Sequence, residues 1–400
     1  MKKRFLSILL AALTLFSAMS GFISCSDKEL EAYEGELYAQ VLPIKNGAKG
    51  IITIVHDDGD YNTVKYMNMQ LGSMGLTASV AMVANKVVDV NGKETKDAEK
   101  WQTLIKESGF DIVCHSQEHS FYGLTDEAHS GSYEHRDNGT VEYDFPAGNI
   151  TNMTAGAAQR LRTVFKSSNQ KVCTYAIPGL PVLDSAYNGL NEEASRILAE
   201  NFVACRYSGG SATYGDVTVP FMNDLSNINY QRLNSYTTLT SGTSEEWIKY
   251  VDDAIQYGGW GIFLMHQIIN QETDYIYNVS KEKAVLLFRH IRKQVATGDL
   301  WCASLTEATL YTKEVETAVA FAEATGKGIA VTVYDELDDN ETFDQPLTVK
   351  VQVLDSWGDV ARVKYDGKKF EVPVYTADDG TKYVMVDVAP DKGVALINKG

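Results

Sequence analysis

The sequence predicts an α/β fold with a mostly parallel sheet, followed by a small all-β domain of sandwich type. From residue 50 to about residue 312, short apolar runs rich in Val and Ile alternate with longer segments of helical period. Several helical segments end on Gly, the usual C-terminal stop of a helix. Further along, strand patterns follow one another without helices. Strict alternation of strands and helices is typical of a parallel sheet, either a barrel or a doubly wound sheet.

The predicted strands and helices take turns along the first 300 residues. The apolar runs predicted as strands are 50–55, 77–84, 110–115, 171–178, 202–207, 261–266 and 300–305. The segments of helical period are 63–75, 97–109, 157–167, 192–201, 244–259 and 280–298. Ser280 is the predicted N-cap of the last of these helices. In such folds the chemistry collects where the strands end and the loops begin.

The C-terminal part is predicted to form a separate small domain. The stretch 314–326 has a helical pattern, and it gives way to alternating strands separated by Asp, Gly and Asn turns. These strands are predicted at 328–337, 346–355, 360–375 and 382–389, the third of which contains the hairpin sequence YDGKKF. From residue 49 onward we therefore expect two domains, an α/β domain at 49–314 and a sandwich-like β domain at 326–400.

The first 25 residues have the pattern of an export signal, with basic residues at 2–4, the apolar run 5–16 and then small residues. The apolar run is shorter than the roughly 20 residues that cross a bilayer. GFISC at 21–25 resembles the lipobox of bacterial lipoproteins, which implies an exported protein anchored to the membrane through lipidated Cys25. Plain secretion is the alternative, because Phe22 replaces the usual Leu. Residues 26–48 are predicted to be a tether.

The charge and the other cysteines narrow the classes of partner. The formal net charge of −17 argues against nucleic acid as a partner, because phosphate contacts need clustered Lys and Arg. A neutral or cationic partner is expected. Cys114, Cys173, Cys205 and Cys302 have neither CxxC spacing nor a dense disulfide framework, and burial as free thiols is the simplest prediction. A bridge between Cys173 and Cys205 stays open.

Polar motifs follow three of the predicted strands. HDDG at 56–59 places two adjacent carboxylates after an apolar run, although Asp and Gly at such a place often form only a turn. HSQEH at 115–119 carries two histidines four residues apart, which can face one ion from a helical turn. His266 ends the run 261–266. The other histidines outside these motifs, His129, His135 and His290, are predicted to be solvated.

These motifs together predict a metal site. The carboxyl ends of parallel strands meet at one rim of a sheet, so we expect the Asp pair to lie close to His115 and His119. Two imidazoles and one carboxylate form a metal triad that leaves positions open for water and substrate, as hydrolytic zinc requires. A divalent cation, with Zn favoured, is therefore the expected cofactor.

In this order and at these separations, HDDG, HSQEH and the LMH that ends at His266 resemble the signature motifs of the NodB-like polysaccharide deacetylases, carbohydrate esterase family four. The segment LWCASLTEA at 300–308 also resembles the closing segment of that family. The resemblance covers roughly residues 49–314. It implies a distorted (β/α) barrel with a divalent metal at its rim, which acts on an acetylated polysaccharide or oligosaccharide.

The resemblance also implies which residues bind the metal and which residue acts as base. Asp58, His115 and His119 would hold the metal. Asp57 would be the general base that acts on the metal-bound water, because an adjacent carboxylate can take the proton of a water whose pKa the metal has lowered.

The remaining roles follow from the same resemblance. His266 would be the general acid that protonates the leaving amine, Leu264 would line the acetyl pocket, and the backbone N–H of Gly179 would bind the oxyanion. The family's Arg, which orients the base, is replaced here by Ala176. Arg206 is the candidate substitute for its guanidinium, although an Arg at a strand end is also an ordinary solvated residue.

Two further departures from the family concern the substrate. His56 stands where the family usually has Phe, and the polar segment 120–150 is predicted to be an insertion beside the rim. Its Tyr and Phe side chains can stack on sugar rings, but packing within the loop is the simpler interpretation. These departures leave the predicted metal site unchanged.

The leading hypothesis is a metal-dependent hydrolase that removes acetyl groups, with an N-acetyl hexosamine favoured over an O-acetyl ester. The alternative is a non-catalytic glycan-binding lipoprotein on a degenerate deacetylase scaffold. The retained Asp57 favours the enzyme, and the missing Arg favours the alternative. A protein whose Asp and His residues are only structural is a third interpretation, which three strand-end matches in family order disfavour. The β domain is predicted to be a spacer, with a carbohydrate-binding module as the alternative.

Overall fold

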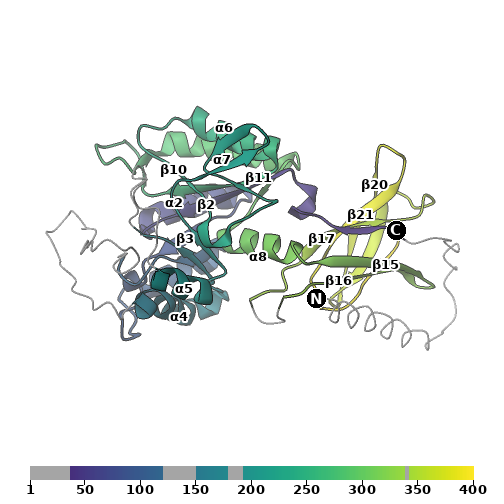
Figure 1. Ribbon diagram of the computed structural model, residues 1–400, viewed down its shortest axis with the longest axis horizontal. Helices are drawn as coiled ribbons and strands as arrows, with labels where there is room; N and C mark the ends of the chain where they lie inside the picture. The colour runs from purple at the N-terminus through teal and green to yellow at the C-terminus, as the bar shows by residue number, and fades with distance from the viewer. Residues whose placement is uncertain (1–36, 120–149, 179–191, 338–341) are drawn as a thin grey trace.

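The apolar runs of the first 300 residues form parallel strands in the computed structural model, which describes residues 37–119, 150–178, 192–337 and 342–400 (Figure 1). The strands of the main sheet, in its spatial order, are β10 (Tyr236–Thr237), β11 (Gly259–Met265), β2 (Gly50–His56), β3 (Ser79–Met82), β4 (Asp111–Cys114), β5 (Thr174–Ala176) and β6 (Ala204–Arg206). All neighbours in this row are parallel. β14 (Leu300–Cys302) pairs in parallel with the start of β2, and β9 (Met222–Asp224) pairs antiparallel with β11.

The segment 233–237 links the two edges of this row of strands and so closes the sheet into a barrel. β10 lies in this segment and pairs with β11 at one edge of the row. At the other edge Leu233 bridges Arg206 at the end of β6, and Ser235 bridges Gly209. The predicted α/β fold with a distorted barrel is therefore confirmed.

Helices lie on the outside of the barrel, with α6 and α7 on one side and α4 and α5 on the other (Figure 1). The helices are α2 (Tyr61–Met74), α3 (Ala98–Ser108), α4 (Ala157–Val164), α5 (Glu192–Asn201), α6 (Ser244–Tyr257), α7 (Lys281–Ala296) and α8 (Leu305–Val315). Gly75, Gly109 and Gly258 end α2, α3 and α6 in the left-handed conformation that Gly adopts without strain. Ser280 caps α7 as predicted, since its side chain accepts a hydrogen bond from the N–H of Lys283.

Alternate residues of each strand belong to two different cores, because successive side chains of a strand point to opposite faces. Ile52 and Ile54 of β2 pack with residues of the surrounding helices. Ile51 and Val55 pack in the second core, inside the barrel. The residues of neighbouring strands in the same core are Ala81, Val113, Ala176, Ala204 and Ile262. Asp57, two positions after Val55, therefore comes on the inner side at the mouth of the barrel.

The C-terminal part forms two antiparallel sheets with a common apolar core, which confirms the predicted β sandwich. One sheet contains β1 (Ala39–Val41), β17 (Leu347–Gln352), β21 (Lys382–Val388) and β20 (Tyr375–Thr376). The other contains β15 (Val319–Thr325), β16 (Gly328–Tyr334), β22 (Ala395–Lys399), β18 (Val360–Tyr365) and β19 (Lys368–Pro373). Four further short strands lie in the barrel part and form two pairs, β7 (Ser211–Tyr214) with β8 (Val217–Pro220) and β12 (Ile268–Ile269) with β13 (Val279–Ser280).

The helix predicted at 314–326 is wrong. α8 ends at Val315, and the Ala-rich stretch from Val319 to Thr325 is strand β15. Ala favours a helix by intrinsic propensity. All seven residues of β15 pair with β16, however, and this ladder of backbone hydrogen bonds overrides the propensity. The sheet therefore starts at Val319, before the predicted domain start at residue 326.

Part of the predicted tether is a strand. Residues 39–41 form β1, which pairs antiparallel with β17 of the sandwich. The segment 37–48 therefore packs with the C-terminal domain, so the prediction of a tether does not hold for it. Cys25 and the predicted export signal lie outside the described residues. Within the described ranges, no helix has the length and apolar character needed to span a membrane.

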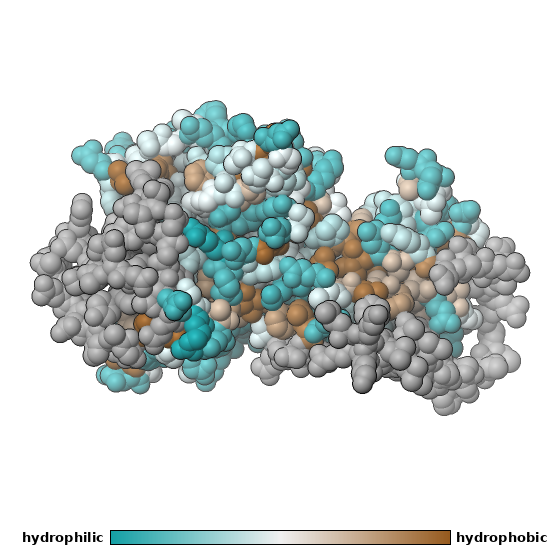
Figure 2. Space-filling model, viewed as in Figure 1, coloured by the Kyte–Doolittle hydropathy of each residue, from teal (hydrophilic) through white to brown (hydrophobic). Residues whose placement is uncertain are grey.

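The barrel and the sandwich share one continuous apolar core. This core runs from the inner strand positions, through Leu305, Ala308 and Tyr311 of α8, to Val331 and Val349 of the two sandwich sheets. Figure 1 shows α8 between the two parts, and Figure 2 shows hydrophobic residues gathered where the sandwich meets the barrel. The two parts therefore form one packed unit.

The four cysteines of the described chain are free. Cys114, Cys173 and Cys205 are buried, and Cys302 is half-buried. Burial raises the pKa of all four thiols, which keeps them protonated and unreactive. The bridge between Cys173 and Cys205 is not formed.

The buried carboxyl of Glu314 at the end of α8 should make stability fall as the pH rises. Its Oε1 accepts the N–H of Gln345 at 2.8 Å, and its buried Oε2 has no hydrogen-bond partner among the described residues. Burial, with smaller contributions from Asp335 and Asp344, raises its pKa to about 8. The folded protein therefore holds this proton over a range in which the unfolded chain has lost it, so stability decreases from the unfolded pKa up to the folded one.

We expect Glu314→Gln to remove this pH dependence, because Gln keeps the acceptor oxygen and carries no charge. From about pH 5 to about pH 9, the melting temperature of the parent should fall by about 2–4 °C relative to the variant. Thermal unfolding at both pH values measures this difference. Glu371→Gln, at an exposed position of β19, is the matched control. Parallel pH profiles for the parent and Glu314→Gln would contradict the prediction.

Candidate active site

The HDDG motif turns the chain from β2 into α2. The N–H of Asp57 donates to β11 at 2.8 Å and so continues the strand pairing by one residue. Asp58 and Gly59 both have left-handed φ angles, 71° and 67°. Asp is one of the few residues other than Gly that tolerate this conformation. Asp60 then caps α2 by accepting the N–H of Thr63 at 2.8 Å, so the turn is held at both ends.

The HSQEH motif follows β4 as a turn, and the predicted regular helical turn is wrong because Ser116 and His119 have left-handed φ angles of 64° and 59°. Gln117 anchors this turn. Its fully buried side-chain amide donates to the carbonyl of Val88 at 2.9 Å. The two imidazoles still converge as predicted, and the ring centroids of His115 and His119 lie 4.9 Å apart.

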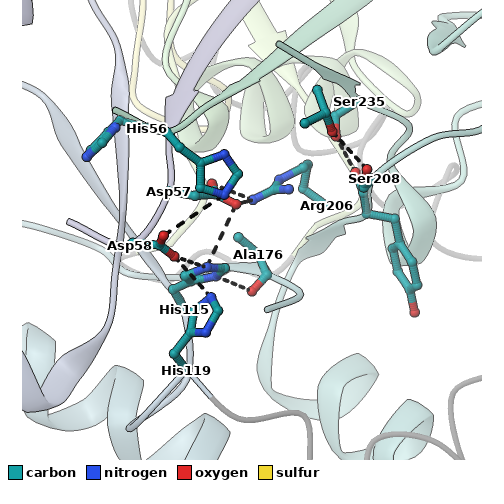
Figure 3. Close-up of polar contacts among 12 residues, drawn as sticks. His56, Asp57, Asp58, His115, His119, Ala176, Arg206, Ser208 and Ser235 are labelled. Atoms are coloured by element: carbon teal, nitrogen blue, oxygen red, sulfur yellow. Dashed lines mark hydrogen bonds and ion pairs between the residues drawn. The ribbon is translucent and has the colours of Figure 1, made fainter. Parts of the chain in front are cut away.

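Asp58, His115 and His119 can hold a divalent cation. One ligand atom from each lies within 4.8 Å of the others, and Oδ1 of Asp58 is 3.4 Å from Nε2 of His115 and 3.0 Å from Nε2 of His119 (Figure 3). Burial by itself raises the pKa of Asp58, but the neighbouring His115 and His119, with a smaller contribution from His266, hold that pKa well below its usual range. The carboxylate is therefore ionised, as a metal ligand must be.

The surroundings of His115 fit a metal ligand. Its Nδ1 lies 2.9 Å from the carbonyl oxygen of Ala176, which can only accept, so Nδ1 carries the proton and Nε2 carries the lone pair. This buried Nε2 has no hydrogen-bond partner in the described part of the chain. A carbonyl behind one ring nitrogen and a free lone pair on the other is the usual arrangement of a metal-binding histidine.

Arg206 lies against the second carboxylate of the HDDG motif. Its Nη2 donates to both carboxylate oxygens of Asp57 at 2.6 Å, and both side chains are buried (Figure 3). Burial by itself raises the pKa of Asp57, but Arg206, with help from His115 and His266, brings it below the usual value. The guanidinium thus comes from the end of β6, whereas the family pattern would place it at Ala176 on β5.

His266 and Leu264 lie at the end of β11, beside β2. Nε2 of His266 is 4.0 Å from Oδ2 of Asp58, and the side chain is 16% exposed. Burial lowers the pKa of His266, although Asp58 and Asp57 oppose this shift. Leu264 is buried, and strand alternation puts it on the inner side of the barrel with His266.

His56 points away from this cluster (Figure 3). It is fully buried, and its Nε2 accepts the backbone N–H of Asp60 at 2.9 Å, so it closes the HDDG turn from behind. Burial lowers its pKa to about 4, which keeps the ring neutral and able to accept this hydrogen bond. His56 therefore supports the conformation of Asp58 without facing the site.

The barrel mouth brings together most of the predicted site residues, namely Asp57, Asp58, His115, His119, Arg206, Leu264 and His266. Gly179 lies outside the described residues. The anchoring roles of Gln117 and His56 were not predicted from the sequence. The signal for Gln117 was an amide inside a polar motif directly after a strand, which is where a turn needs a side chain to fix it.

The purified protein should bind about one divalent ion per chain, and His115→Ala should lose it, because a site of three protein ligands cannot spare one. Metal content by mass spectrometry after dialysis measures both. His290→Ala is the matched control, since His290 lies on α7 and pairs with Asp252 at 2.7 Å, and it is not among the candidate ligands. Equal metal content in His115→Ala and His290→Ala would contradict the assignment of the ligands.

Comparison with known proteins gives distant likenesses. No family model matches the sequence. A gellan lyase from Bacillus sp. is 26% identical over 316 residues, which are 76% of this chain. The chain spans only 11% of the length of that curated relative.

Several solved structures resemble about two thirds of the chain. The Xyl-CE4 domain of a multidomain xylanase from the hindgut metagenome of Trinervitermes trinervoides has 13% identity and a TM-score of 0.35, over 65% of this chain and 89% of that one. A family 4 acetyl xylan esterase from Clostridium thermocellum, in complex with a cobalt ion, has 14% identity and a TM-score of 0.36, over 64% and 89%. A family 4 pseudoenzyme from Bacillus anthracis has 12% identity and a TM-score of 0.37, over 65% of each chain. These likenesses concern the fold alone.

Proposed function

We propose that this protein is a metal-dependent hydrolase that removes acetyl groups from a polysaccharide or oligosaccharide. The proposal depends on one observation, which is that two adjacent carboxylates have different partners. Asp58 converges with two imidazoles, whereas Asp57 is held by Arg206. A site that only binds a metal needs the first carboxylate, and a hydrolase also needs the second as a base.

Asp58, His115 and His119 would hold the cation, and their nitrogen and oxygen donors favour zinc. When bound, such a cation polarises a carbonyl oxygen and lowers the pKa of a water molecule. Asp57 would accept the proton of the attacking water, because Arg206 keeps it ionised and fixes its orientation. His266 would donate a proton to the leaving group, and its lowered pKa makes its protonated form a stronger acid.

The favoured substrate is an N-acetyl hexosamine within a glycan, with an O-acetyl ester second. A net charge of −17 suits a neutral glycan and a deacetylated product that carries ammonium groups. Acetate release from a panel of N-acetylated and O-acetylated oligosaccharides, with zinc supplied, tests the proposal. Release by the parent and none by Asp57→Asn is the expected result. No release from any member of the panel by metal-loaded parent protein would contradict it.

A glycan-binding protein without turnover is the second candidate. Ala176 favours this candidate, because the polysaccharide deacetylases that the sequence resembles have Arg at this place. The contact between Arg206 and Asp57 disfavours it. Calorimetry with the same oligosaccharides separates the two candidates. Binding of a glycan that remains fully acetylated after prolonged incubation would support the second candidate.

We also propose that the protein is exported and anchored by a lipid on Cys25, as the lipobox-like sequence suggests. Cys25→Ala should move the protein from the membrane fraction to the soluble fraction of the bacterial cell, because the lipobox-like sequence then has no thiol to carry the lipid. Immunoblots of separated fractions measure this. Cys302→Ala, at a half-buried free thiol of the barrel, is the control. Membrane attachment that survives Cys25→Ala would reject the anchor.

A further inference from the structure

A row of rings leads outward from His266. The centroid of the His266 ring lies 4.9 Å from that of Tyr277, which lies 5.5 Å from that of Tyr275. Exposure increases along the row. The side chain of His266 is 16% exposed, Tyr277 is half-buried and Tyr275 is 48% exposed. The row therefore connects the candidate metal centre with the surface.

The loop between β12 and β13 holds these rings in place. Thr240 donates its N–H to the carbonyl of Ile276 at 2.8 Å and its hydroxyl to that of Asn278 at 2.6 Å. The amide of Asn278, which is 2% exposed, donates to Thr273 at 2.6 Å. Lys283 of α7 pairs with Glu272 at 3.0 Å. A ligand on this loop would meet a surface that is already ordered, and so would lose little affinity to ordering it.

The exposed side chains at the tip are large and mostly apolar. Tyr275 is followed by Ile276, which is 53% exposed. Single exposed apolar residues are ordinary, whereas these two lie side by side on an ordered loop close to the candidate site, where a ligand can contact both. Pyranose rings present a face of C–H groups that packs on an aromatic ring, while the tyrosine hydroxyl suits their hydroxyl groups.

We propose that Tyr275 and Tyr277 form a subsite for the sugar ring next to the acetylated one. The proposal rests on the proposed deacetylase function and narrows its substrate class to chains of at least a few pyranose units. A single N-acetylated sugar would reach the metal centre without touching Tyr275. An oligosaccharide would lie along the row and gain the stacking contacts.

Chain-length dependence tests the subsite. With a tetra-N-acetylated chitotetraose as substrate, Tyr275→Ala should raise KM about 10-fold, the effect of losing one good aromatic contact. Tyr275→Phe should restore most of the affinity, because it keeps the ring. Tyr375→Ala is the matched control, since Tyr375 is an exposed tyrosine that stacks on a second tyrosine in the sandwich. A KM for Tyr275→Ala equal to that of Tyr375→Ala would overturn the proposal.

Binding without turnover separates this proposal from the proposed function. Calorimetry with zinc-loaded Asp57→Asn protein and the same tetrasaccharide should show a dissociation constant about 10-fold weaker after adding Tyr275→Ala. If the parent releases no acetate, the proposed deacetylase function is wrong. Titration of the parent and of Tyr275→Ala with the tetrasaccharide then still shows whether Tyr275 contributes to binding. Equal dissociation constants with and without Tyr275→Ala, or no tetrasaccharide binding at all, would reject the subsite.

Discussion

Asp57→Asn should lower kcat for acetate release by about 10²- to 10⁴-fold, which is the usual contribution of a general base. Asn has the shape of Asp but takes no proton from water at neutral pH. The metal should stay bound at about one ion per chain, because the candidate ligands Asp58, His115 and His119 are unchanged. The measurement pairs initial rates of acetate release with metal analysis of the same preparation.

Stability must be followed in the same variant. Asp57→Asn leaves the buried guanidinium of Arg206 without its carboxylate, so the free energy of unfolding should fall as well. Asp111→Asn is the matched control, since Asp111 is a carboxyl on β4 that accepts the N–H of Thr306 at the opposite end of the strand. Its kcat should equal that of the parent. Full activity of Asp57→Asn with metal in place would remove Asp57 from the mechanism.

Arg206→Met should lower the free energy of unfolding by about 3–5 kcal/mol, the cost of leaving one partner of a buried ion pair behind. Urea unfolding measures this. Arg362→Met is the control, because Arg362 pairs with Glu371 on the exposed surface of the sandwich and such a pair contributes at most about 1 kcal/mol. The double variant Asp57→Asn with Arg206→Met should recover stability relative to Arg206→Met. Equal losses for Arg206→Met and Arg362→Met would contradict the buried pair.

The same replacement should change the pH dependence of activity. In the parent, the pKa of Asp57 is below its unfolded value, so its stabilising contribution is complete above that value and is lost as the pH falls through the folded pKa. Without Arg206, burial is left as the largest influence and raises the pKa of Asp57. The acidic limb of the kcat/KM profile should therefore move to higher pH in Arg206→Met. An unmoved acidic limb would show that Arg206 does not tune the base.

The position of the candidate metal ligands was predictable because it depends on local signals. Asp58 and His115 each come directly after an apolar run, and parallel strands bring their carboxyl ends to one rim. No contact between distant residues had to be known. The turn around Gln117 was not predictable in detail, because its left-handed angles depend on hydrogen bonds to Val88 and other distant backbone groups.

Arg206 was a candidate partner of Asp57 from its place at a strand end, but the contact itself depends on the closed barrel. Arg206 lies on β6, four strands away from β2 along the sheet, and only the return of the sheet through 233–237 places it across the mouth. That closing segment is too short to show a strand pattern. β15 was mistaken for a helix for a related reason, since an Ala-rich sequence has no strong preference of its own for a strand and its partner β16 decides.

The pairing of β1 with β17 has a consequence for the order in which the chain can fold. Ala39 lies opposite Val351 in the ladder, so the first strand described has no strand partner until nearly the whole chain has been synthesised. Chains usually fold from the N-terminus as they emerge, but here the earliest strand must wait. During that wait α8 also lacks the sandwich residues that cover it. The sandwich and the packing of α8 against it are therefore expected to form only after the C-terminal strands have been made.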